Sequence, residues 1–143
     1  MKVFLDTNLL LDGYFQRPGA AASDQVIALC DGVNQSGWIA WHTLSNIFYL
    51  VRGHSRSAQT ALQFVSDLLS WSEVAVTGKP EALQATQAGM NDFEDALQVA
   101  AAVSCGASVI VTRNTRDFQA SPIPVMTPEQ FLAHVATLGS ASP

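Results

Sequence analysis

The sequence predicts an α/β protein with a three-layer α/β/α fold, in which helices cover both faces of a central parallel sheet of four to five strands. Short apolar strands alternate with helical segments along the whole chain. None of these strands alternates apolar with polar residues, as a strand with one exposed face would. The 143 residues suit one domain. We expect a single domain over residues 1–135 and a frayed tail over residues 136–143.

The first half of the chain supplies two of the expected strands, KVFLD at residues 2–6 and GWIAW at residues 37–41. Apolar residues at helical spacing predict the helices between and after them. These helices are expected at residues 9–15, 21–33, 42–54 and 57–71. We expect Thr43 to cap the third of them and Gly53 to end it.

The second half supplies three more strands and three more helices. The strands are expected at residues 73–77, 108–112 and 123–127, and the helices at residues 79–89, 91–107 and 128–138. Gly106 is expected to end the second of these helices, because glycine readily adopts the left-handed conformation found at helix ends. We find no internal repeat, low-complexity tract or linker.

The charge of the chain argues against a broad nucleic-acid-binding surface. Twelve acidic residues against seven lysines and arginines give a net charge of −5, whereas affinity for phosphate backbones normally comes from basic residues. Any binding of RNA or DNA must therefore be local, or must use cations that an acidic site recruits.

Cysteine usage and hydropathy indicate where the protein resides. Cys30 and Cys105 lie far apart and have no metal-ligand spacing, so we expect buried free thiols and a reducing compartment. No signal peptide and no apolar stretch of about 18 or more residues is apparent. We therefore expect a cytoplasmic protein without a membrane span.

Polar residues gather where strands turn into helices: at Asp6-Thr7-Asn8, at His42-Thr43 and along residues 112–118, with a fourth cluster at residues 91–95. Two readings of these residues are open. Asp, Thr and Asn cap helices, but ligands of parallel sheets also bind beyond the carboxyl ends of the strands.

The cluster at residues 91–95 opens a helix whose continuation, ALQVAAAV, is small and apolar enough to be buried. Asp92 can simply cap this helix, and we expect Glu94 to point elsewhere. Asp95 shares a helix face with Asp92. A carboxylate that leads into such a helix needs a partner or a cation, so we favour a functional role for Asp95.

Two segments, VFLDTNLLLD at the start and DFEDALQVAAAVSCGASVIVTRNTRDF near the end, together with the strand–helix alternation between them, resemble PIN domains. More narrowly they resemble the small VapC-like toxin ribonucleases, over about residues 1–135. The resemblance implies a metal-dependent endoribonuclease that cuts single-stranded RNA with Mg²⁺ or Mn²⁺. It also implies an antitoxin partner and a homodimer.

The resemblance implies a catalytic and metal-binding set of Asp6, Asp95 and Asp117. It places four supporting polar residues around them: Asn8, Asn46, Thr112 and Asn114. Arg113 and Arg116 flank this site on the segment TRNTRD and could bind the RNA backbone, although solvation or pairing with Asp117 is at least an equal alternative.

One departure from the family pattern concerns Asn46. The family usually has a glutamate in the first turn of the helix after the second strand, and Asn114 likewise stands where an acid is common. The neutral amide of Asn46 lowers the charge of the site by one. The alternative function is therefore a PIN-fold binding module with weak or lost catalysis.

Two other classes with acids at strand ends fit poorly. A signalling receiver domain needs a lysine late in the chain, and the last lysine here is Lys79. A phosphatase with an aspartyl nucleophile needs a second acid two residues after Asp6, where Asn8 stands.

The helix at residues 42–54 carries more apolar surface than one core-facing stripe requires. Ile47, Phe48, Leu50 and Val51 surround Tyr49. We expect part of this helix to contact a second copy of the chain or an antitoxin.

Overall fold

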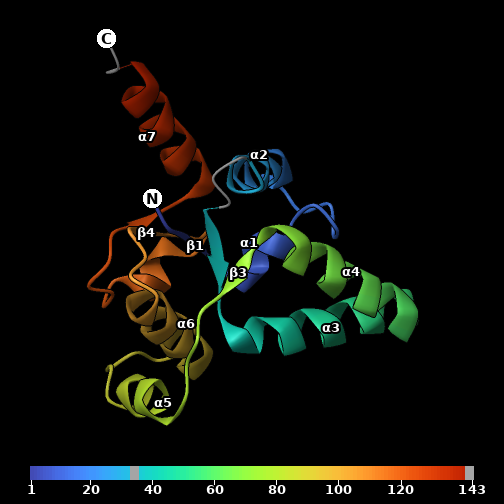
Figure 1. Ribbon diagram of the computed structural model, residues 1–143, viewed down its shortest axis with the longest axis horizontal. Coiled ribbons are helices and arrows are strands. Elements are labelled where there is room, and N and C mark those ends of the chain that lie inside the picture. Colours follow the sequence, from blue (N-terminus) through green and yellow to red (C-terminus); the bar gives the residue numbers. More distant parts are fainter. Residues whose placement is uncertain (33–35, 141–143) are drawn as a thin grey trace.

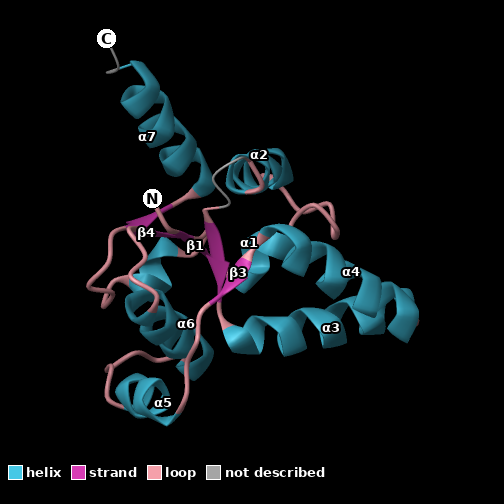
Figure 2. Ribbon diagram, viewed as in Figure 1, coloured by secondary structure: helices cyan, strands magenta, loops and turns pink. Residues whose placement is uncertain are grey.

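The structure, a computed structural model, describes residues 1–32 and 36–140, and it confirms the predicted three-layer α/β/α fold (Figure 2). Its sheet has five strands in the order β3-β2-β1-β4-β5, and every neighbouring pair is parallel. The strands are β1 (Val3–Leu5), β2 (Gly37–Ile39), β3 (Glu73–Val74), β4 (Val109–Val111) and β5 (Val125–Met126).

The order of the strands reverses at β1. This strand pairs with β2 on one side, where Val3 is opposite Gly37, and with β4 on the other, where Leu5 is opposite Val111. Chain connections leave the two sides of such a strand in opposite directions, which opens a crevice at the carboxyl ends of the strands. The residues that follow β1 and β4 are therefore brought together, although more than a hundred residues separate them.

Helices cover both faces of the sheet (Figure 1). On one face lie α1 (Thr7–Leu11), α2 (Ala20–Cys30), α3 (Trp41–Ser55), α4 (Ala58–Trp71) and α7 (Pro128–Ser140). On the other lie α5 (Lys79–Thr86), α6 (Phe93–Ser104) and the 3₁₀ turn η1 (Thr115–Phe118). No helix in the described part of the chain is long and apolar enough to cross a membrane.

Burial on both faces explains why the strands show no polar alternation. Val3 and Leu5 point into the core beneath α1, α2 and α7, whereas Phe4 points into the core beneath α6. All three side chains are at most 1% exposed. A strand with apolar neighbours on both sides must be apolar throughout.

Helix α3 differs from the prediction at both ends. It begins at Trp41 with Ala40 as its N-cap, and Thr43 is not a cap, because its buried hydroxyl lies 2.8 Å from that of Thr7 in α1. The helix continues through Gly53 to Ser55 and ends at Arg56, whose φ is 57°. A glycine inside a helix costs only about 1 kcal/mol, and packing against α4 (Figure 1) offsets that cost.

Two other boundaries are shifted. Helix α7 continues to Ser140, so residues 136–140 are helical and the expected frayed tail is corrected there, while residues 141–143 lie outside the described residues. Extending an existing helix adds one hydrogen bond for each residue fixed, which favours continuation. Helix α2 ends at Cys30, and residue 33, the expected end of this helix, lies outside the described residues.

Candidate active site

Asp6 follows β1 and is buried, with 2% of its surface exposed. It occupies the N-cap position of α1, yet its side chain forms no capping hydrogen bond. Instead its Oδ1 accepts a hydrogen bond from Gln98 Nε2 at 2.8 Å, and its Oδ2 accepts one from Thr112 Oγ1 at 2.7 Å. Burial raises the pKa of Asp6, while these two hydrogen bonds oppose the rise. The structure therefore favours a site for this carboxylate over the capping alternative.

Asp92 and Asp95 lie at the start of α6. Asp92 caps the helix, as predicted, because its Oδ1 accepts a hydrogen bond from the Asp95 backbone N–H at 3.1 Å. Burial, together with repulsion by Asp92, Glu94 and Asp6, raises the pKa of Asp95 to about 7. Asp95 can therefore exchange a proton near neutral pH, which an ordinary aspartate cannot do.

The expectation that Glu94 points away from the site is wrong. Its carboxylate accepts hydrogen bonds from Gln98 Nε2 at 2.9 and 3.0 Å, and it lies 3.4 Å from Thr7 Oγ1 and 3.5 Å from His42 Nε2. Burial works against ionisation of Glu94, but the interactions with His42 and Gln98 outweigh it and lower its pKa. Glu94 is therefore an ionised carboxylate inside the site.

These acids surround a cavity of about 510 Å³. The residues that line it are Thr7, Asn8, Asn46, Tyr49, Leu50, Asp92, Glu94, Asp95, Asn114 and Asp117. This lining contains four acids and no lysine or arginine. Of the predicted site residues, Asp95, Asp117, Asn8, Asn46 and Asn114 thus share one cavity.

Two of the predicted residues lie below this cavity. Asp6 is buried close enough to repel the charge of Asp95, and Thr112 both donates to Asp6 and accepts from the Asn114 backbone N–H at 3.1 Å. A second cavity, of about 430 Å³, continues from Asp95 and Asp117.

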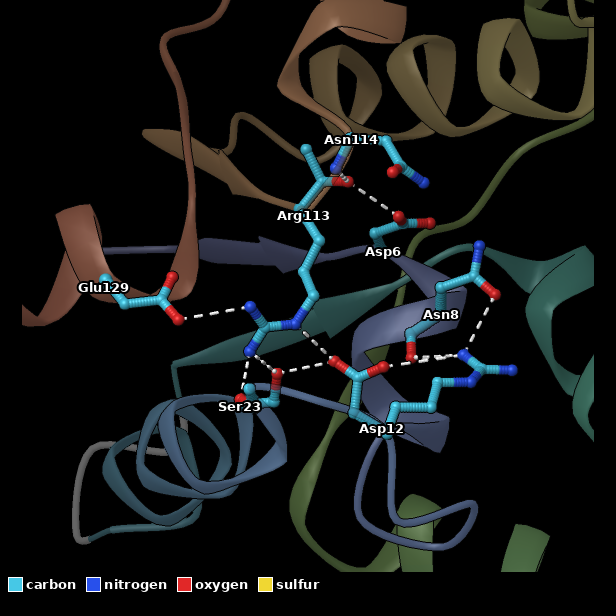
Figure 3. A network of polar contacts seen from close by, with 10 residues as sticks. Asp6, Asn8, Asp12, Ser23, Arg113, Asn114 and Glu129 are labelled. Carbon is cyan, nitrogen blue, oxygen red and sulfur yellow. Dashed lines mark hydrogen bonds and ion pairs between the residues drawn. The ribbon is translucent and has the colours of Figure 1, made fainter.

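The two candidate RNA-binding arginines have different surroundings. Arg116 lines the second cavity together with Asp117. Arg113 lines neither cavity, and its guanidinium points toward Asp12, Ser23 and Glu129 (Figure 3). The expectation that Arg113 binds substrate is therefore corrected, because its donors are already used within the fold.

The contacts of Arg113 are specific and short. Its Nε donates to Asp12 Oδ2 at 2.9 Å, its Nη1 to Glu129 Oε1 at 3.1 Å, and its Nη2 to Ser23 Oγ at 2.9 Å and to the Gly19 carbonyl oxygen. The Asp12 carboxylate is buried and also accepts from Ser23 Oγ at 2.7 Å. These bonds fasten the end of β4 to α1, α2 and α7.

Four residues of the site were not in the predicted set: Thr7 and His42, which the sequence placed only in polar clusters at strand ends, and Glu94 and Gln98. One signal was available for Gln98, because it is the single polar residue in the run ALQVAAAV, and a buried amide needs a partner. Glu94 precedes Gln98 by one helical turn, which lets the two side chains meet. His42 stands in one of the polar clusters at strand ends, but that position alone does not predict its contact with Glu94.

The donor set fits a hard divalent cation. Carboxylate and amide oxygens are the ligands that Mg²⁺ and Mn²⁺ prefer, and Asp6, Asp95 and Asp117 supply them at the carboxyl ends of β1 and β4. The side-chain oxygen of Gln98 is buried and has no hydrogen-bond partner within the described part of the chain. A buried acceptor of this kind can accept a hydrogen bond from a bound water, including a water that hydrates a cation.

Comparison with known proteins identifies the family of the chain. A sequence profile described as the PIN domain matches residues 2–116. None of the curated proteins matches the chain.

Several solved structures share the fold. A chain of the DNA-bound VapBC complex of Salmonella typhimurium is similar over 90% of this chain and 98% of its own, with a TM-score of 0.68 and 22% identity. A chain of VapBC-1 of nontypeable Haemophilus influenzae is similar over 90% of this chain and 99% of its own, with a TM-score of 0.66 and 16% identity. A chain of a toxin–antitoxin complex of Klebsiella pneumoniae is similar over 89% of this chain and 98% of its own, with a TM-score of 0.65 and 20% identity.

Proposed function

This chain belongs to the PIN domain family, and we propose that it is a metal-dependent endoribonuclease that cuts single-stranded RNA as the toxin of a toxin–antitoxin pair. One observation carries the proposal. Asp95 and Asp117, which come from α6 and η1, line the same cavity at the carboxyl ends of the strands, above the buried carboxylate of Asp6. This arrangement provides a concentrated negative charge that a divalent cation would neutralise.

Asp6, Asp95 and Asp117 would hold the Mg²⁺ or Mn²⁺ ion. A bound ion of this kind lowers the pKa of its water and neutralises charge on the phosphate under attack. One of these acids would also orient or deprotonate that water. Thr112 and Gln98 keep the Asp6 carboxylate in place through their hydrogen bonds.

The exposed side chains at the mouth of the cavity suit a single-stranded substrate. Tyr49 is 63% exposed and Leu50 is 46% exposed, and both line the cavity from α3. An exposed aromatic ring stacks on unpaired bases, which a duplex does not offer. Arg116, in the adjoining cavity, can contact a phosphate. Such local contacts would allow a chain with a net charge of −5 to bind RNA.

Cleavage of a labelled single-stranded RNA tests the proposal. We expect cleavage with Mn²⁺ or Mg²⁺, none with excess chelator, and none for Asp117→Asn. Asp31→Asn, which changes an exposed aspartate outside the site, serves as the matched control and should retain activity. If chelation has no effect on cleavage, the metal-dependent mechanism is wrong.

A second candidate function is a PIN-fold binding module. Its support is Asn46, which lines the cavity as a neutral amide and forms no side-chain hydrogen bond within the described residues. A site with weaker charge could bind RNA without cutting it. RNA binding by the wild-type protein without metal-dependent cleavage would favour this function over the nuclease.

We also propose an antitoxin partner. Its support is the fold shared with toxin–antitoxin complexes and an apolar groove of about 380 Å³ on this chain, lined by side chains of α1, α2 and α4 such as Leu10, Ile27 and Phe64. Co-purification with the product of the neighbouring open reading frame tests it. Phe64→Asp should abolish that co-purification, whereas Leu138→Asp, a change of an exposed leucine on α7, should not.

A homodimer is the last part of the proposal. Its support is apolar surface at the β3 edge of the sheet. Trp41 is 67% exposed and Val76 is 88% exposed, and both line a groove of about 340 Å³ there. Edge strands and exposed apolar patches favour association.

A further inference from the structure

Glu94 brings a carboxylate into the acidic cavity from a position that the cation-binding set described above does not use. One of its carboxylate oxygens lies within 4.8 Å of one oxygen of Asp92 and one of Asp95. Asp92 is already engaged as the cap of α6, whereas the side chains of Glu94 and Asp95 do not cap the helix. On the α3 side, the same cavity has the neutral residues Asn46, Tyr49 and Leu50.

The side chain of Glu94 is held toward the site rather than toward solvent. Gln98, Thr7 and His42 lie within 3.5 Å of its carboxylate, and they come from three different helices, α6, α1 and α3. A surface glutamate with no function would gain little from such fixation, because exposed ion pairs contribute little to stability. Its fixed position allows it to act as a ligand.

An independent observation concerns Gln98, which is 1% exposed. Its Nε2 donates to both Asp6 and Glu94, so this one amide joins the two carboxylates. Its Oε1 is buried and has no partner among the described residues. A buried acceptor without a partner is unfavourable, and a water of a cation bound beside this amide would satisfy it.

We propose that Glu94 is a ligand of the divalent cation and supplies the carboxylate that Asn46 does not. This inference rests on the proposed metal-dependent function. The ion is then bound by acids from β1, α6 and η1, and α3 contributes only neutral groups to the cavity. Gln98 is a positioning residue in this arrangement, since it fixes Asp6 and Glu94 relative to each other.

Mn²⁺ titration by isothermal calorimetry tests the proposal without any activity measurement. We expect Glu94→Gln to weaken Mn²⁺ binding at least about tenfold. Adding Asn46→Glu to this variant should restore the affinity, because residue 46 lines the same cavity from the opposite helix. Glu73→Gln, the same change at an exposed residue of β3, should bind Mn²⁺ as the wild type does.

His42→Ala separates a ligand from a structural ion pair. If Glu94 serves only its contact with His42, Glu94→Gln and His42→Ala will lose the same amount of thermal stability, and neither variant will lose Mn²⁺ affinity. That result overturns the inference. Unchanged affinity in Glu94→Gln, or no recovery with Asn46→Glu, also overturns it.

Failure of the proposed function gives a different result. In that case the wild-type protein binds no Mn²⁺ and cuts no RNA, and the inference falls with it. If instead Asp95→Asn abolishes binding while Glu94→Gln does not, only the inference about Glu94 is wrong.

Discussion

At the scale of single residues, we expect the buried carboxylate of Asp6 to be needed for RNA cleavage but not for the stability of the metal-free protein. Burial raises its pKa, so ionised Asp6 destabilises the metal-free protein. We expect Asp6→Asn to lower RNA cleavage at least about 100-fold and to leave the melting temperature of the metal-free protein unchanged or higher. Cleavage assays and thermal unfolding in chelator measure both effects. A large loss of thermal stability would instead assign Asp6 a mainly structural role.

Asp95 should make the stability of the metal-free protein depend on pH. Its pKa is raised from 3.8 to about 7 by burial and by repulsion from its acidic neighbours. Between these values the folded protein holds a proton that the unfolded chain has released, so this favourable contribution is full below pH 3.8 and is lost as the pH rises through 7. Asp95→Asn should therefore be the more stable protein at pH 8.

Thermal unfolding of both proteins in chelator, between pH 4.5 and 8, measures this difference. We expect the gap in melting temperature to widen with pH, by about 2 to 4 °C for each kcal/mol of repulsion removed. A gap that is constant across this range would show that Asp95 does not titrate there.

Tyr49 is the residue at which substrate binding can be tested apart from metal binding. We expect Tyr49→Ala to weaken binding of single-stranded RNA by about 1–3 kcal/mol, because one base loses its stacking partner. Tyr49→Phe keeps the ring and should bind as tightly as the parent. Fluorescence anisotropy in the Asp117→Asn background, which prevents cleavage, measures the affinity. Equal affinity in the alanine variant would contradict stacking.

At the scale of elements, the first turn of α6 concentrates the acids of the site. Asp92, Glu94 and Asp95 all lie at the amino end of this helix. The positive end of the helix dipole favours negative charge there, and the cap formed by Asp92 satisfies one free N–H group. The helix therefore tolerates a cluster of carboxylates that would repel one another more strongly elsewhere.

The loop after β4 is held by Arg113 rather than by contacts with substrate. Arg113→Ala would remove the shorter of the two arginine contacts of the buried Asp12, leaving the Arg17 contact at 3.5 Å and the Ser23 hydroxyl at 2.7 Å. Removing one partner of a buried ion pair costs about 3 kcal/mol or more. We therefore expect a lower midpoint in urea unfolding.

Arg116→Ala is the matched variant with which Arg113→Ala should be compared. Arg116 lines the cavity beside Asp117, so we expect its loss to weaken RNA binding and leave the urea midpoint nearly unchanged. The reverse pattern, with Arg113→Ala fully stable but weak in RNA binding, would show that Arg113 contacts substrate after all.

At the scale of the whole molecule, the strand order creates the site. Because β1 lies between β2 and β4, Asp6 and Thr112 come within hydrogen-bond distance, and helix α6 places Gln98 and Glu94 against them. At the edge of the sheet that β3 forms, Trp41 and Val76 are exposed. The proposed catalytic site and the proposed dimer contact therefore lie on different parts of the molecule.

Sedimentation velocity tests association at the β3 edge. We expect the wild-type protein to sediment as a dimer and Val76→Asp to sediment as a monomer, because a buried charge at the contact would be unpaired. Leu83→Asp, which changes an exposed leucine of α5, is the control and should remain dimeric. A dimer in both variants would place the contact elsewhere.

The sequence by itself determined the layers of the fold. Apolar strands without polar alternation can only be buried on both faces, which predicted the parallel sheet and its helical cover. Local chemistry also sufficed for the cap at Asp92 and the end of α6 at Gly106, whose φ is 73°. In each case the decisive interactions lie within a few residues of one another, so the sequence displays them directly.

Only the tertiary structure decided which polar side chains meet. Gln98 and Thr112 reach Asp6 across 92 and 106 residues of chain, and Arg113 reaches Asp12 across 101. Spacing along a helix tells which residues share a face, but the docking of α6 on the sheet determined that Glu94 faces the cavity. Those contacts depend on strand order and helix placement, which result from the packing of the whole chain rather than from any local pattern.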